Sequence, residues 1–90
     1  MKLLYFAWVK ERVGLGEETV TPPPEVKDLA GLVAWLRGRG AGYERAFADL
    51  KAVRAAVNQE YVGFDHKVAL GDEVAFFPPM TGGCPLEILA

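Results

Sequence analysis

The sequence of 90 residues predicts an α+β domain in which a helix packs on one face of a sheet. The first observation is a pair of strand-like segments, 3–9 and 17–21, that precede an amphipathic helix. The second is a set of further strand-like segments after that helix, at 53–57, 61–68 and 73–77. A hairpin, a crossover helix and a return to the sheet form such a layered structure, although periodicity alone does not distinguish among small α+β folds. The length fits one domain.

The N-terminal half predicts a hairpin followed by the main helix. Residues 3–9 are aliphatic and aromatic without a helical repeat, which is typical of a strand covered on both faces. Residues 11–16 predict a short helical turn or loop, and 17–21 predict the second strand because they contain a β-branched run. Three prolines at 22–24 end that strand, since proline cannot donate to the ladder. One helix face is then formed by residues spaced i, i+3, i+4 and i+7, namely Leu29, Leu32, Val33 and Leu36.

The C-terminal half predicts a short helix and the remaining strands. Tyr43, Phe47 and Leu50 have helical spacing, which indicates a second, shorter helix. Alternation over 53–57 predicts a third strand, followed by a turn at 58–60 and a short strand and loop over 61–68. Residues 73–77 predict the last strand, which two prolines end.

Composition excludes several classes of function. The net charge is −2 with acids and bases intermingled, so no basic block indicates nucleic-acid or membrane binding. Cys84 is the single cysteine and cannot form an internal disulfide, which fits a reducing compartment; we expect a cytoplasmic protein. His66 is the single histidine, so we expect a surface residue and no metal site. No segment approaches the roughly 20 apolar residues that span a bilayer.

The informative segment is 71–83, which reads Gly-Asp-Glu-Val-Ala-Phe-Phe-Pro-Pro-Met-Thr-Gly-Gly. Glycines lack side chains, so Gly82-Gly83 forms a thin end that can closely approach another molecule. Pro78-Pro79 restrict φ and limit how far the following segment wanders. Residues 80–83 could then extend on the order of 13 Å beyond the prolines.

Phe76 and Phe77 alternate across the last predicted strand. One of them is therefore expected to enter the core, while the other faces a partner as an exposed side chain. The predicted partner-binding residues are Phe76, Phe77, Pro78 and Pro79. With Met80, they are expected to form an apolar patch larger than a monomer normally exposes.

This C-terminal segment resembles that of the molybdopterin synthase small subunit (molybdopterin-converting factor subunit 1), a family of ubiquitin-like sulfur carriers. The family combines a Gly-Asp-Glu-Val strand, a Phe-Pro-Pro segment and a final Gly-Gly. Residues 3–7 with Glu11-Arg12, and residues 56–58, also resemble the family. The resemblance implies a β-grasp (ubiquitin-like) roll. It would have a mixed sheet of four to five strands, with one main helix and a short second helix on one face.

The resemblance also implies a mechanism. In the family, a partner enzyme uses ATP to adenylate the terminal glycine carboxylate, and sulfur then replaces one oxygen to give a thiocarboxylate. The molybdopterin synthase large subunit receives the tail, and the sulfur passes to cyclic pyranopterin monophosphate. Here Gly83 would carry the thiocarboxylate, and Gly82, Thr81 and Met80 would form the delivery arm. The chain would bind no cofactor tightly and would not be catalytic alone.

The sequence departs from the family because it continues beyond Gly83 with residues 84–90. While they are attached, Gly83 has an amide carbonyl and no carboxylate to adenylate. We therefore predict a carrier domain over 1–83 and an extension over 84–90 that a processing protease removes. Alternatively, the tail is permanent, with Leu86, Ile88 and Leu89 packing on the sheet or a partner, or it is an artefact of gene prediction. Cys84 has no Lys, Arg or His beside it to activate its thiol, which argues against a catalytic role.

Three further functions remain open at this point. The chain could be a sulfur carrier for another pathway, such as cysteine, thiamine or tRNA thiolation. It could be a ubiquitin-like modifier that joins Gly83 to lysines of other proteins. It could also be a non-donating interaction domain that keeps its tail.

Overall fold

The computed structural model describes residues 1–79, and in these residues five strands form one mixed sheet. The strands are β1 (Lys2–Tyr5), β2 (Glu17–Thr19), β3 (Arg54–Val57), β4 (Glu60–Val62) and β5 (Glu73–Phe77). Their order across the sheet is β2-β1-β5-β3-β4. β1 and β5 are parallel neighbours, and the other neighbouring pairs are antiparallel. This arrangement confirms the α+β prediction and the expected mixed sheet of four to five strands.

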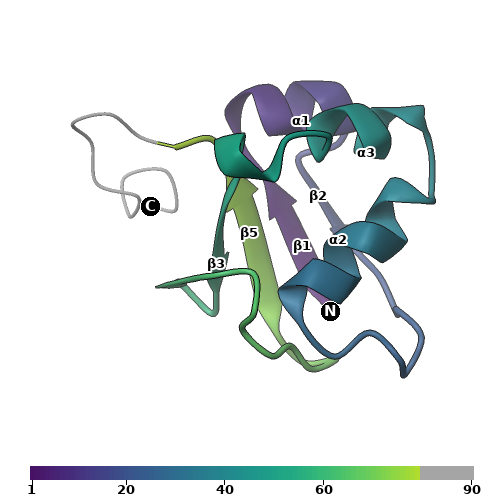
Figure 1. Cartoon of the computed structure of the whole chain (residues 1–90), viewed down its shortest axis with the longest axis vertical. Helices are drawn as coiled ribbons and strands as arrows, with labels where there is room; N and C mark the ends of the chain where they lie inside the picture. The colour runs from purple at the N-terminus through teal and green to yellow at the C-terminus, as the bar shows by residue number, and fades with distance from the viewer. Residues whose placement is uncertain (80–90) are drawn as a thin grey trace.

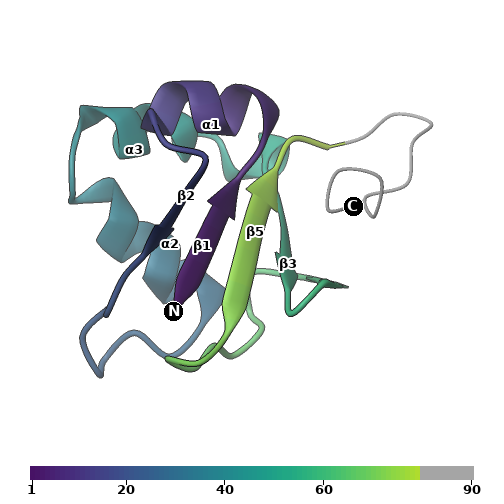
Figure 2. The same ribbon diagram turned by 180° about the vertical axis from the view of Figure 1, so that it is seen from behind.

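The helices cover one face of the sheet and leave the other face open. They are α1 (Ala7–Val13), α2 (Leu29–Arg37) and α3 (Ala41–Ala46), with a short 3₁₀ helix, η1, at Leu50–Ala52. Figure 1 shows α2 and α3 in front of the strands, and Figure 2 shows β1 and β5 in front when the molecule is seen from behind. The predicted main helix and short second helix therefore correspond to α2 and α3.

The sequence of α2 explains both its position and its packing. Asp28 caps its N-terminus, because a carboxylate oxygen accepts a hydrogen bond of 2.8 Å from the backbone N–H of Gly31. The predicted apolar face is fully buried against the sheet, and it consists of Leu29, Leu32, Val33 and Leu36. Each of these side chains contributes about 1.5–3 kcal/mol by leaving water.

The prediction of one strand over residues 3–9 is wrong after Tyr5. The chain turns at Ala7, whose φ is +53°, and continues as α1. α1 buries Val9 and ends at Gly14, which has a φ of +93° and donates its N–H to the carbonyl of Lys10. Trp8 packs against the core from the same helix. The apolar run is long because it covers two different parts of the core, first as a strand and then as a helix.

Four other boundaries differ from the predictions, and one of them is the start of β3 at Arg54 instead of residue 53. β2 ends at Thr19, and the second helix ends at Ala46, so Leu50 belongs to η1 instead. β4 already begins at Glu60, because Asn58 and Gln59 alone form the turn, with φ values of +52° and +68°. The last predicted strand, 73–77, is confirmed to the residue as β5.

Candidate functional site at the root of the C-terminal arm

The predicted arm leaves the domain where β5 ends. Phe77 is the last residue of the strand, Pro78 is half-buried and Pro79 is exposed. The predicted delivery arm and reacting residue (Met80, Thr81, Gly82 and Gly83) and the extension 84–90 lie outside the described residues. The part of the site that the structure describes is therefore the root of the arm.

Phe76 anchors this root in the core beneath the helices. Its side chain is fully buried. Its ring stacks on Tyr5 of β1, with centroids 6.1 Å apart and planes 14° apart. It also meets Phe47 edge to face, with centroids 5.0 Å apart. Pairs of this kind contribute about 0.5–1.5 kcal/mol beyond the area they bury, so β5 is held firmly up to its last residues.

Phe77 points to the opposite face of the sheet, as the alternation predicted. The expectation that one phenylalanine of the pair is exposed is wrong, however, because Phe77 is also fully buried. It forms a second apolar cluster with Ala56 and Ala75, against which Leu4 and Phe6 pack. Apart from Ala75, these side chains come from β1, the residue after it and β3, which are distant from β5 in sequence. The alternation of β5 alone therefore does not predict that Phe77 is covered.

Tyr61 is the exposed aromatic residue at this place, and the sequence reasoning did not identify it. It lies on β4 opposite Ala56, is 50% exposed, and meets Phe77 edge to face with centroids 5.7 Å apart. The open-face patch is defined here by the residues of this face that keep exposed surface: Leu4, Phe6 and Tyr61. They pack against the buried side chains of Ala56, Ala75 and Phe77. The signal that could have located Tyr61 is its position just after the turn at 58–59, which places β4 beside β3.

A polar cluster beside Tyr5 joins α3 and the connection between α2 and α3 to β1 and β2. One carboxylate oxygen of Glu18 accepts hydrogen bonds from the hydroxyls of Tyr5 (2.8 Å) and Tyr43 (2.6 Å). The other accepts from the Arg39 guanidinium at 3.1 Å. Partial burial acts to raise the pKa of Glu18, but the three hydrogen bonds together outweigh it and hold this pKa below its ordinary value.

The two tyrosines respond in the opposite direction. Burial, followed by the hydrogen bond to the Glu18 carboxylate, raises the pKa of Tyr5, and the same causes raise that of Tyr43. Both phenols therefore stay protonated as hydrogen-bond donors. The cluster supports the arm root structurally, because it fixes Tyr5, whose ring stacks on Phe76.

Other parts of the described chain lie away from the arm root. Among residues 1–79, no group of His, Cys, Asp and Glu side chains could hold a metal ion. His66 is exposed, as predicted. Within the same residues, no helix is long and apolar enough to cross a membrane.

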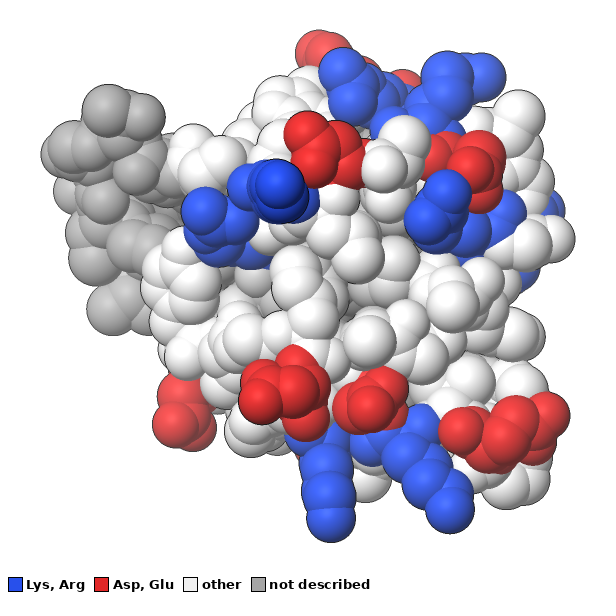
Figure 3. Space-filling model, viewed as in Figure 1, with Lys and Arg blue, Asp and Glu red and all other residues white. Residues whose placement is uncertain are grey.

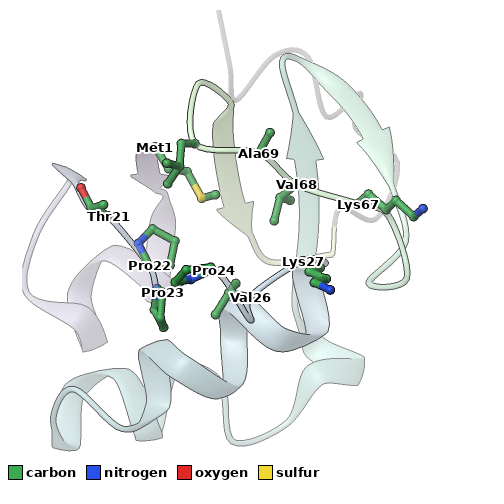
Figure 4. Close-up of a pocket in the computed structure, with 11 residues that line it drawn as sticks. Met1, Thr21, Pro22, Pro23, Pro24, Val26, Lys27, Lys67, Val68 and Ala69 are labelled. Carbon is green, nitrogen blue, oxygen red and sulfur yellow. The ribbon is translucent and has the colours of Figure 1, made fainter.

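An apolar pocket of about 520 Å³ lies at the other end of the sheet, between the proline segment 22–24 and residues 67–70. Figure 4 shows Pro22 to Pro24 on one side of this pocket and Val68 and Ala69 on the other. Lys27 and Lys67 lie at its margin. Met1 and residues 67–70 line this pocket, so it lies at the end of the sheet where β1 and β5 begin. The arm leaves from the opposite end, after Phe77.

Comparison with known proteins identifies the family of the chain. Residues 3–83 match the model of the ThiS family. This chain belongs to the ThiS family. The molybdopterin synthase sulfur carrier subunit of Escherichia coli (strain K12) is 46% identical to this ThiS-family chain over 84 residues, covering 92% of the chain and 99% of the relative. The subunit of the same name from Chlamydomonas reinhardtii is 39% identical over 85 residues, covering 92% and 98%. The resemblance predicted from residues 71–83 is confirmed.

Solved structures agree with this assignment. A Pyrococcus furiosus structure described as molybdopterin converting factor, subunit 1 is 30% identical to this ThiS-family chain; the match covers 88% of the chain and 95% of that structure with a TM-score of 0.71. The crystal structure of SAMP1 from Haloferax volcanii is 25% identical over 92% and 98%, with a TM-score of 0.72. A complex of subunits 1 and 2 of the molybdopterin-converting factor from Helicobacter pylori 26695 contains a chain with the same fold (TM-score 0.61, 22% identity, coverage 91% and 96%).

Proposed function

We infer that this chain is the sulfur carrier subunit of molybdopterin synthase and acts in molybdenum cofactor biosynthesis. The observation that carries this conclusion is the 46% identity to the Escherichia coli subunit over 99% of that subunit's length. The family match supports it further because it ends at Gly83, the second glycine of the predicted arm.

The proposed chemistry takes place at the carboxyl carbon of Gly83. An ATP-dependent partner adenylates the Gly83 carboxylate, and sulfur then replaces one oxygen to give a thiocarboxylate. The chain donates this sulfur to cyclic pyranopterin monophosphate in the active site of the large subunit. Gly82, Thr81 and Met80 form the slender arm that carries Gly83 there, since a segment ending in two glycines fits a narrow channel. The carrier itself needs no tightly bound cofactor.

The described residues hold and present this arm. Phe76 fixes the end of β5 through its contacts with Tyr5 and Phe47. Pro78 and Pro79 follow directly and restrict the direction in which the arm leaves. The large subunit is the proposed occupant of the open-face patch, because a partner that receives the arm must lie beside its root. The Helicobacter pylori complex of subunits 1 and 2 supports a partnership of this kind.

The extension 84–90 is proposed to be removed before the carrier works. A Gly83 that is followed by Cys84 has an amide in place of the carboxylate, so it cannot be adenylated. A processing protease that cuts after Gly83 would release the domain 1–83.

The experiment combines mass measurement with reconstitution. The chain is recovered from its native cells, and its intact mass is expected to correspond to residues 1–83, with a fraction showing one oxygen-to-sulfur exchange. In a reconstituted synthase, we expect the chain that ends at Gly83 to transfer sulfur. We expect no sulfur transfer by the full chain. Gly83→Ala should abolish most transfer, whereas Gly38→Ala is a matched control, since a Cβ at Gly38 makes only ordinary contact with the carbonyl of Trp35 at 3.4 Å.

Two results would contradict parts of this proposal. Equal transfer by the full chain would show that residues 84–90 need not be removed. Higher-mass conjugates of the chain with cellular proteins, without sulfur transfer by the reconstituted synthase, would favour a modifier and reject the carrier function.

A further inference from the structure

The charged residues of the chain divide between the two ends of the sheet. Among residues 1–79, three ion pairs join Lys2 to Glu17, Arg37 to Glu44 and Arg39 to Glu18, at N–O distances of 2.6–3.4 Å. The remaining charged side chains form no ion pair within the described part of the chain. Their positions therefore decide the electrostatic field around the molecule.

Cations predominate at the end from which the arm leaves. Since β1 and β5 are parallel, both strands finish at this end, where α1 follows β1 directly. β3 begins there too, because Arg54 is paired with Phe77. The arm end is defined here by the charged residues of α1, α3, η1 and their flanks that are outside the three ion pairs. It contains five cations and two acids: Lys10, Arg12, Arg45, Lys51 and Arg54 with Glu11 and Asp49.

Acids predominate at the opposite end, where β5 begins and the turn between β3 and β4 lies. This end contains six acids and two lysines: Glu25, Asp28, Glu60, Asp65, Asp72 and Glu73 with Lys27 and Lys67. Figure 3 shows several blue groups with red ones among them at the end with α1 and α3, and a row of red side chains with blue ones projecting below it at the other end. The net charge of the whole chain is only −2, but residues 1–79 form a domain with a positive and a negative end.

A groove at the arm end places two of the cations together. It has a volume of about 370 Å³ and lies between α1 and the segment from α3 to η1. Trp8, Arg12, Arg45 and Asp49 are among the residues that line it. The Arg12 guanidinium lies 4.3 Å from the centroid of the Trp8 ring, which orients its planar face. Two guanidinium groups at one groove, one of them held in place, suit carboxylate side chains.

We propose that the arm end docks against a carboxylate-rich protein surface around the channel that receives the arm, with Arg12 and Arg45 as its main charged contacts. This inference rests on the proposed function and specifies the chemistry of the partner surface. Insertion of the arm brings the rim of the receiving channel over the end where the arm begins. The separated charges also orient the carrier before contact, because the positive end is drawn toward the acidic rim and the negative end is repelled.

The experiment measures association of the carrier with the molybdopterin synthase large subunit from the same genome, by stopped flow at several salt concentrations. The test variant is Arg12→Glu with Arg45→Glu. The matched control is Lys27→Glu with Lys67→Glu, which makes the same change in net charge at the opposite end. We expect the test variant to lower the association rate constant by about tenfold at low salt and to weaken its salt dependence. The control should change the rate constant less than about twofold.

Further variants separate charge from folding. Arg12→Lys with Arg45→Lys keeps the charges and should retain most of the wild-type rate constant. Thermal unfolding of every variant shows whether the domain remains folded, since Arg12 also packs on Trp8. Equal slowing by the test and control variants would show that only net charge matters and would overturn the proposal.

Failure of the proposed function gives a different result. If the wild-type carrier does not bind the large subunit at all, the assigned partner is wrong. Carboxylate binding by the arm end is then tested by a nuclear magnetic resonance titration with a polyglutamate peptide. Shifts of the Trp8 indole and Arg12 side-chain signals, absent in the test variant, would support a carboxylate-binding surface. A titration without such shifts would refute it.

Discussion

Replacing Tyr61 with alanine is expected to weaken binding of the large subunit about 30-fold while the domain stays folded. Tyr61 is 50% exposed, although its ring meets that of Phe77. A large aromatic side chain buries about 150–250 Å² when fully covered, so roughly 100 Å² of Tyr61 remains for a partner to cover. At about 20 cal/mol per Å² this area corresponds to about 2 kcal/mol. That free energy is about a 30-fold increase in Kd.

Isothermal titration calorimetry of the carrier with the large subunit measures this change. Tyr61→Phe keeps the ring and should change Kd by less than about twofold, which separates the ring from the hydroxyl. Leu70→Ala is the control for an exposed apolar residue elsewhere, because Leu70 is 57% exposed and lies at the opposite end of the sheet. If Tyr61→Ala and Leu70→Ala both leave Kd unchanged, the open-face patch is not part of the interface and the reasoning is refuted.

Three further predictions concern the stability of the domain. Phe77→Ala should lower the free energy of unfolding by about 3 kcal/mol in chemical denaturation, because it empties the second cluster; an unchanged value would contradict its burial. Because folding lowers the pKa of Glu18, its ionised carboxylate stabilises the folded domain above pH 4.5, which is the ordinary pKa of the group. This stabilisation is lost as the pH falls through the lower pKa that Glu18 has in the folded domain. Acid unfolding of Glu18→Gln should therefore depend less on pH than that of the wild type, and exposed Glu60→Gln should behave as wild type. Gly42→Ala should lower the melting temperature, because its Cβ would lie 2.5 Å from the carbonyl oxygen of Arg12; Gly71→Ala, with open space around it, should not.

The sequence by itself determined the elements with a clear local pattern. The apolar spacing from Leu29 to Leu36 identified α2, and residues 73–77 identified β5, because in both the side-chain periodicity records which face is buried. The order of Gly, Pro and Phe residues over 71–83 indicated the family, since each residue type has a chemical reason at its place. The boundary between β1 and α1 was missed, because an apolar run does not show where the chain turns from strand to helix.

Only the tertiary structure decided what lies around the arm root. Phe77 is covered because the turn at 58–59 brings Tyr61 beside it and because Leu4 and Phe6 come from a parallel neighbour in the sheet. Acids and bases are likewise intermingled along the sequence, and they separate only when the strands align, which places the cations of α1, α3 and η1 at the end with the arm. Both features depend on pairing between residues far apart in the chain, and local sequence patterns do not record such pairing.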